Sequence, residues 1–166
     1  YDDRYILQGA IRADGSVNFG PENKWGYFPS LAAAWRISEE AFFNVDFISD
    51  LKLRYETGLT GNQGGSGNIF GVLNMIATPW GSGFLPRNYA NKDLKWEETL
   101  TNNIGLNLAL FRNRIQFEFD YYVKNTDNLL IQNPLPDYMG TDGQNSIAAP
   151  FVNIGSLENK GWIFAI

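Results

Sequence analysis

The stretch Lys95–Asn128, KWEETLTNNIGLNLALFRNRIQFEFDYYVKNTDN, decides the fold. Apolar residues alternate with small or polar residues over most of Ile104–Phe111, and apolar residues alternate with mostly polar ones over Ile115–Lys124. Because successive side chains of a β-strand point to opposite faces, each half predicts a strand with one apolar face. Arg112-Asn113, between the two halves, is a dipeptide typical of a tight turn. The stretch therefore predicts a long antiparallel hairpin.

The second predicted strand carries Glu118, Asp120 and Lys124 on the face opposite its apolar residues. Ionised groups without partners are very unfavourable inside a dry protein core. We therefore expect one face of this hairpin to be wet and the other to be apolar.

Composition restricts the class of protein. The 166 residues suffice for one ordinary domain, and 44% hydrophobic with 19% charged residues exclude a disordered chain. A net charge of -5 argues against a nucleic-acid partner. The chain has neither cysteine nor histidine, which excludes disulfide scaffolds, thiol nucleophiles and histidine-based triads. Nothing in the sequence predicts a cofactor.

Membrane insertion through a helix is not expected, because no apolar run approaches the roughly 18–20 residues that a spanning helix needs. A spanning β-strand needs only about 9–11 alternating residues, so a membrane location through strands stays open.

The same alternation predicts three strands before the hairpin and one after it. They are Arg4–Ala13, Tyr27–Ile37, Leu51–Thr60 and Phe151–Leu157. Proline cannot donate a ladder hydrogen bond, so we expect Pro29 at the start of its strand. We expect the terminal apolar residues WIFAI to follow the last strand.

Long and short connections alternate along the chain. The long ones are Asp14–Trp25, Gly61–Asp93 and Asn125–Pro150, and the short ones are Ser38–Ser49 and Arg112-Asn113. Up-and-down strands with long loops at one end and short turns at the other are typical of an outer-membrane barrel. A soluble antiparallel sheet also alternates in hydrophobicity, so a soluble β-sandwich is the alternative. Aromatic residues near both strand ends would suit two interfacial girdles or ordinary core packing.

Five segments together resemble a known family. They are DGSVNFG (Asp14–Gly20), WGYFPSLAAAWRISEEAFF (Trp25–Phe43), LKLRYETGLTGNQ (Leu51–Gln63), LKWEETLTNNIGLNLALFRNRIQFEFDYYVKNTDNLL (Leu94–Leu130) and NIGSLENKG (Asn153–Gly161). In this order and spacing they resemble the barrel of SusC/RagA-type TonB-dependent transporters. Val17 is a departure, since the family usually has a second serine there.

The resemblance implies an all-β fold: antiparallel up-and-down strands in a section of a large transmembrane β-barrel with long extracellular loops. The family's barrel has about 22 strands around a plug. The resemblance also implies import of an oligosaccharide or peptide across the Gram-negative outer membrane, with no catalysis. The implied partners are outer-membrane lipid, a SusD-like surface lipoprotein acting as a lid, and TonB acting through the plug.

Residues 1–166 would then form a partial barrel domain of about six strands from the C-terminal half, without the plug and the remaining strands. The start at Tyr1-Asp2-Asp3-Arg4, directly ahead of a strand pattern, favours an internal cut.

Four aromatic residues of the two longest loops are candidates for contact with ligand or lid. They are Trp80, Phe84, Tyr89 and Tyr138. Flat aromatic rings bind sugar faces and peptide side chains, and loops on a rigid barrel commonly carry binding sites. The alternative is that these residues pack the loops together. A soluble lectin-type module with aromatic loops is the runner-up function.

Glu118 and Asp120 share one strand face, about 7 Å apart by strand geometry, which would be compatible with an inverting glycosidase. A hydrated lumen wall near Lys52, Arg54 and Lys124 is the simpler interpretation. No metal site is expected, since the acidic loop residues lack calcium-loop spacing. Gly64–Gly67 lacks the lysine of a phosphate-binding loop and predicts a flexible loop.

Overall fold

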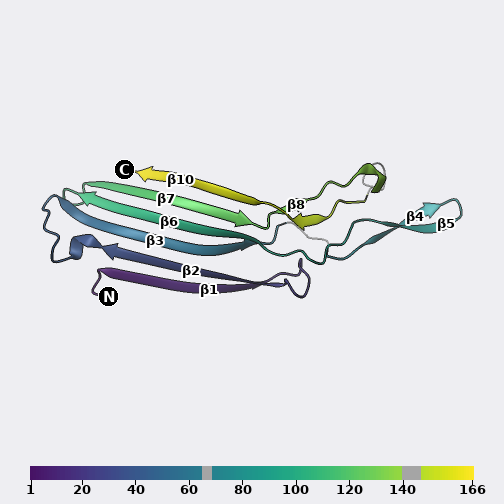
Figure 1. Cartoon of the computed structure of the whole chain (residues 1–166), viewed down its shortest axis with the longest axis horizontal. Helices are drawn as coiled ribbons and strands as arrows, with labels where there is room; N and C mark the ends of the chain where they lie inside the picture. The colour runs from purple at the N-terminus through teal and green to yellow at the C-terminus, as the bar shows by residue number, and fades with distance from the viewer. Residues whose placement is uncertain (65–68, 140–146) are drawn as a thin grey trace.

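The computed structural model describes residues 1–64, 69–139 and 147–166. One six-stranded antiparallel sheet, in the order β1-β2-β3-β6-β7-β10, dominates the molecule (Figure 1). Its strands are β1 (Tyr5–Gly15), β2 (Trp25–Arg36), β3 (Ile48–Asn62), β6 (Glu97–Leu110), β7 (Ile115–Asp127) and β10 (Ser156–Ala165). The predicted all-β, up-and-down architecture is confirmed.

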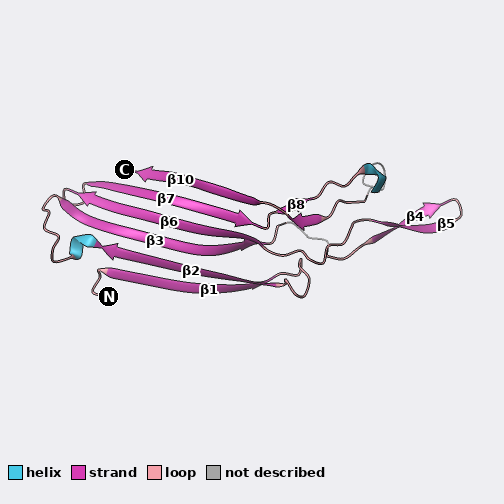
Figure 2. Ribbon diagram, in the orientation of Figure 1, coloured by secondary structure: helices cyan, strands magenta, loops and turns pink. Residues whose placement is uncertain are grey.

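Two short hairpins and two single turns of 3₁₀ helix complete the described elements (Figure 2). The hairpins are β4 (Leu73–Thr78) with β5 (Gly81–Pro86), and β8 (Leu130–Gln132) with β9 (Phe151–Asn153). The helical turns are η1 (Ile37–Glu39) and η2 (Asp137–Met139). In the described part of the chain no helix has the length and apolar character needed to cross a membrane.

The central hairpin is confirmed, with a wider turn than expected. β6 and β7 pair from Glu98↔Asp127 to Leu110↔Ile115, and the amide of Arg114 donates to the carbonyl of Leu110. Phe111, Arg112 and Asn113 all have positive φ, of 52°, 58° and 63°. The turn therefore has four residues, Phe111–Arg114, and three of them are left-handed.

Several strand limits differ from the prediction. β2 begins at Trp25, so Pro29 lies within the strand. The β2–β3 pairing begins at Ser30↔Gly58, one residue after Pro29, which explains how the sheet accommodates a residue without an amide hydrogen.

The last predicted strand, Phe151–Leu157, is two elements. Gly155, with φ of 88°, separates β9 from β10, and β10 pairs with β7 as far as Ala165↔Glu118. The WIFAI segment is therefore mostly strand. Gly61–Asp93 likewise contains the β4–β5 hairpin instead of being wholly irregular.

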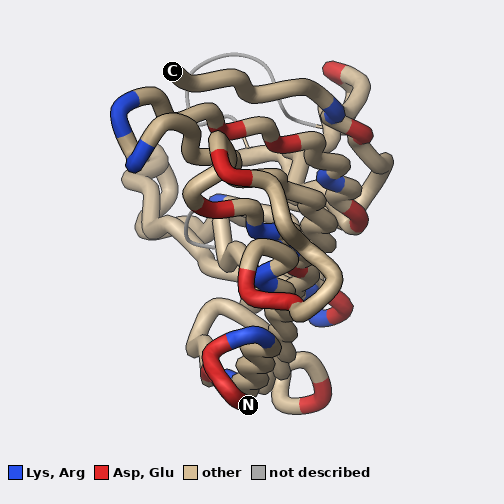
Figure 3. Tube along the Cα trace, turned by 90° about the vertical axis from the view of Figure 1, so that its left-hand side faces the viewer, with Lys and Arg blue, Asp and Glu red and all other residues tan. Residues whose placement is uncertain are grey.

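The two faces of the large sheet have different chemistry, as predicted. One cross-strand row of the first face, the outer face, reads Trp35↔Leu53↔Leu106↔Phe119↔Phe164. Many of its large apolar residues are exposed, among them Leu7, Ile11 and Trp162. The second face, the inner face, carries most of the charged strand residues, and acidic and basic positions are interspersed along the trace (Figure 3).

The buried core lies at the long-loop end of the sheet. It consists of Phe19, Phe28, Ile69, Leu94 and Trp96, with Leu59, Leu130 and Phe151 packed against it. The Phe28 ring crosses β3 at Gly61, where a Cβ would overlap it. The core therefore ties loops to strand ends, and no second sheet covers the exposed apolar face among the described residues.

Candidate functional site

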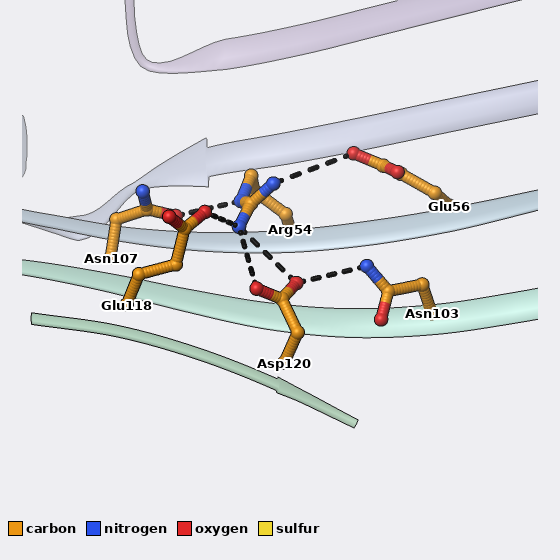
Figure 4. A network of polar contacts seen from close by, with 6 residues as sticks. All are labelled: Arg54, Glu56, Asn103, Asn107, Glu118 and Asp120. Atoms are coloured by element: carbon orange, nitrogen blue, oxygen red, sulfur yellow. Dashed lines mark hydrogen bonds and ion pairs between the residues drawn. The ribbon is translucent and has the colours of Figure 1, made fainter. Parts of the chain in front are cut away.

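A polar network on the inner face joins three neighbouring strands (Figure 4). Arg54 of β3 lies opposite Gly105 of β6, which in turn lies opposite Asp120 of β7. The Arg54 guanidinium donates to Asn107 Oδ1 at 2.6 Å, to Glu118 Oε1 at 2.6 Å and to Asp120 Oδ1 at 3.2 Å. These charge-assisted bonds fix the arginine across the sheet.

Gly105 makes room for this network. A Cβ at this position would overlap Asp120 Oδ1 and lie 2.9 Å from Arg54 Nη2. Asn103, two residues earlier on the same face of β6, donates to Asp120 Oδ1 at 2.9 Å. Glycine therefore allows the guanidinium and the carboxylate to meet directly above β6.

The network combines one cation with three carboxylates. Glu56 Oε1 lies 3.7 Å from Arg54 Nη1, and Asp120 is buried while Glu118 is partly exposed. Because Arg54 engages both Glu118 and Asp120, the two carboxylates form a structural ion-pair network. The geometry does not favour the glycosidase alternative, which needs one carboxylic acid free to donate a proton.

The long loops are joined by side chains that sequence reasoning did not single out. Glu97 accepts from the side chain of Asn62 and from the backbone amide of Leu130, both at 3.1 Å. Asn153 accepts from the Lys95 amide at 3.0 Å and donates to the Lys95 and Asn128 carbonyls at 2.8 and 2.9 Å. Glu97 and Asn153 thus connect the end of β3, the start of β6 and the end of β7.

The first loop joins the same assembly through its DGSVNFG segment. The Ser16 hydroxyl donates to Gln63 Oε1 at 2.8 Å and accepts from the Asn18 amide at 3.1 Å. Ser16 is buried, and Phe19 packs on Trp96 with ring centroids 5.2 Å apart. The only signal for these contacts in the sequence was that their residues lie in the motifs that carry the family resemblance.

The four aromatic candidates occupy three different environments. Trp80 lies at the tip of the β4–β5 hairpin and is 93% exposed, and Phe84 lies exposed on β5. Tyr138 is exposed in η2, on the other loop arm. Tyr89 donates its hydroxyl to the Met139 carbonyl at 2.8 Å, so it links the two loops. The structure therefore does not gather the four residues into one pocket.

The sequence predicted no metal site, and the structure bears on this only for the residues that it describes. There, no three acidic side chains are grouped as metal ligands. Of the acidic loop residues, Asp14 forms a 2.6 Å ion pair with Arg12, and Asp142 lies outside the described residues. Gly65–Gly67 of the predicted flexible loop also lie outside them.

Known protein families and structures agree with this architecture. The family model described as TonB dependent receptor-like, beta-barrel, matches residues 1–165. The chain belongs to the TonB-dependent receptor β-barrel family. The uncovered apolar face of the six-stranded sheet and this membership give no support to the soluble lectin alternative.

Relatives of this TonB-dependent receptor chain match it almost end to end. The TonB-dependent receptor P39 of Formosa agariphila is 40% identical, covering 100% of the chain and 16% of the relative. The TonB-dependent receptor SusC of Bacteroides thetaiotaomicron is 39% identical, covering 99% of the chain and 17% of SusC. The chain thus spans about a sixth of the length of these relatives.

Solved structures show the same fold. The RagAB peptide importer in the closed-closed state superposes with a TM-score of 0.88 and 29% identity, covering 99% of this chain and 18% of that one. The open-open state superposes with a TM-score of 0.85.

Proposed function

We propose that the chain is a section of the wall of a larger TonB-dependent importer in the outer membrane of a Gram-negative bacterium. In this proposal the outer face contacts lipid and the inner face lines the barrel interior. The observation that carries it is the exposed apolar face opposite a charged, hydrogen-bonded face within one sheet. The 16–18% coverage of the relatives and structural neighbours supports a piece of a much larger barrel.

The dimensions of the outer face support this assignment. Apolar residues point outward along β6 from Leu100 to Leu110, with Asn102 as the exception. At about 3.3 Å per residue and a strand tilt of about 40°, this stretch is roughly 25 Å tall, the height of an outer-membrane apolar band. Asn102 accepts from Tyr55 and Thr57 at 3.1 and 2.8 Å, so its carbonyl oxygen is satisfied.

The cargo in this proposal is an oligosaccharide or a peptide, and the importer works with TonB and a SusD-like surface lipoprotein. The structurally similar RagAB complex is a peptide importer, which supports the peptide class. The chain would take part in transport and not in catalysis, and its relatives are named as receptors and importers.

Uptake in living cells tests the function. The full-length parent protein is expressed in a strain lacking its own copy, and entry of labelled oligopeptides and oligosaccharides is measured with TonB present and deleted. The proposal predicts uptake of one class that disappears with TonB. Equal uptake in both strains would contradict it.

We expect Trp80→Ala to weaken uptake several-fold while barrel assembly stays unchanged, because the ring is exposed at a loop tip and offers a flat contact surface. The measurement is the concentration dependence of uptake in the intact transporter. An unaltered apparent affinity for the substrate would remove Trp80 from the candidate contacts. The same assay applied to Phe84→Ala, Tyr89→Phe and Tyr138→Ala orders the remaining candidates.

A further inference from the structure

Two long connections leave the same end of the six-stranded sheet (Figure 1). The β3–β6 loop, residues 63–96, carries the β4–β5 hairpin, and the β7–β10 loop, residues 128–155, carries the β8–β9 hairpin and η2. The whole β6–β7 hairpin separates the two loops in sequence. They nevertheless contact each other along residues 87–91 of the first loop.

Asn88 is a buried polar residue of the β3–β6 loop, only 5% exposed. Its Oδ1 accepts from the Val72 amide and its Nδ2 donates to the Phe70 carbonyl, both at 2.9 Å. A longer bond of 3.5 Å runs from Nδ2 to the Tyr89 carbonyl, so these three partners all belong to the same loop. Because a buried amide without partners is unfavourable, the Asn88 side chain holds residues 70–72 in place.

The backbone around Asn88 pairs with the other loop. Asn88 forms a parallel β-bridge with Ala148, and the Ala148 amide donates to the Arg87 carbonyl at 2.8 Å. One residue therefore holds its own loop through its side chain and the β7–β10 loop through its backbone.

Two side chains that follow Asn88 add further bonds between the loops. The Tyr89 hydroxyl donates to the Met139 carbonyl and Asn91 Nδ2 donates to the Phe151 carbonyl, both at 2.8 Å. Both bonds are partly buried, which strengthens them relative to bonds in open water. The β3–β6 loop is thus bonded to the other loop on both sides of the Ala148 bridge.

Each of these contacts joins two groups of the chain itself. They therefore do not depend on which strands or loops of a longer parent cover the outside. Proteins open locally in contiguous cooperative units, and a unit opens only when the bonds that its parts share are broken. Neither loop can leave its position around Asn88 without breaking bonds that also hold the other loop.

We propose that the β3–β6 and β7–β10 loops open and close as one cooperative unit centred on Asn88. A change that loosens one loop then loosens the other, so the arm that carries Trp80 and the arm that carries Tyr138 are energetically coupled. This inference goes beyond the import function and does not depend on it, because it concerns the loops in the absence of cargo.

Amide hydrogen exchange in two variants of the same loop tests this coupling. The full-length parent protein in detergent carries Asn88→Ala or, as the control, Thr78→Val. Both substitutions remove side-chain hydrogen bonds within the β3–β6 loop, but Thr78 donates to the Gly81 carbonyl at 2.7 Å, at the distant turn of the β4–β5 hairpin. We expect Asn88→Ala to speed exchange about tenfold at residues 147–153 of the other loop as well as at residues 69–73. Thr78→Val should speed exchange only within β4 and β5.

Tyr89→Phe provides a second variant that keeps the ring and removes only the bond to Met139. We expect faster exchange in both loops, by a smaller factor than in Asn88→Ala. If Asn88→Ala does not assemble, this variant decides the question, and faster exchange confined to the residues next to Met139 would overturn the proposal.

Two results with Asn88→Ala would also overturn the coupling. Faster exchange in the β3–β6 loop with wild-type exchange at residues 147–153 would show that the loops open independently. Exchange at residues 147–153 that rises equally in Thr78→Val would show that the hairpin tip, and not Asn88, controls the second loop.

Discussion

At the scale of single residues, Gly105 shows how the inner face depends on the absence of a side chain. A Cβ there would overlap Asp120 Oδ1 and crowd the Arg54 guanidinium. We expect Gly105→Ala to lower the stability of the assembled barrel by about 1–3 kcal/mol, the usual range for overpacking. Gly9→Ala is the matched control, because its new methyl would meet Leu31 only at 3.9 Å. The measurement is the urea midpoint of each variant in detergent, and equal midpoints would contradict the prediction.

Glu40, in the connection after β2, gives a pH prediction at the same scale. A hydrogen bond from the Tyr5 hydroxyl, a second from the Trp35 indole and the charge of Arg4 together lower the pKa of Glu40 against the opposing effect of burial. A lowered pKa in the folded state means that the stabilisation is present above the unfolded pKa, about 4.3. It is lost as the pH falls through the folded value.

Glu40→Gln should therefore unfold at lower urea than wild type at pH 7, and the difference should shrink as the pH falls below about 4. The measurement is the urea midpoint of both proteins across this pH range. A difference that is the same at every pH would contradict the role of the carboxylate charge.

At the scale of elements, one side chain joins the start of β6 to the end of β7. Asn153 makes three hydrogen bonds, to the backbone of Lys95 and Asn128. Removing it leaves those backbone groups without this partner, at about 1–2 kcal/mol of local stability. We expect Asn153→Ala to speed amide hydrogen exchange in the long loops and to leave β6 and β7 protected. Asn74→Ala, exposed on β4, is the control, and unchanged loop exchange in Asn153→Ala would contradict the prediction.

Elements with clean alternation could be predicted from the sequence, and others could not. β3, β6 and β7 alternate along most of their length because one face is wet and the other apolar, so their faces were predicted correctly. Most of β10 was not predicted as a strand, because Gly161, Ile163 and Ala165 leave this part of its inner face without polar side chains. Gly161 leaves room there for the Tyr122 ring. The β4–β5 hairpin was not predicted, because its sequence lacks charges on either face and is flanked by glycine and proline.

The contacts of the polar network around Arg54 also could not be predicted from the spacing of its residues along the chain. Arg54 and Asp120 are 66 residues apart in sequence and meet only through the register of β3, β6 and β7. Lys52, Arg54 and Lys124 were expected near the carboxylates, but which cation engages them follows from that register. Among the aromatic candidates, Phe84 lies on β5 and Tyr138 in η2, and this division between two loop arms could not be seen in the sequence.

At the scale of the whole molecule, the proposed function depends on which solvent meets each face of the sheet. Leu106 and Asn107 are adjacent on β6, and their side chains point to opposite faces. Spin labels attached through single cysteines at these two positions, in the full-length protein reconstituted in lipid, report contact with oxygen or with a water-soluble nickel complex.

We expect the label at Leu106 to be accessible to oxygen and protected from nickel, as a lipid-facing group is. The label at Asn107 should show no such preference for oxygen. A label at Leu106 that both reagents fail to reach would place this face in a dry core, and one that nickel reaches freely would place it in water. Either result would contradict the assignment of the sheet to the wall of an outer-membrane barrel.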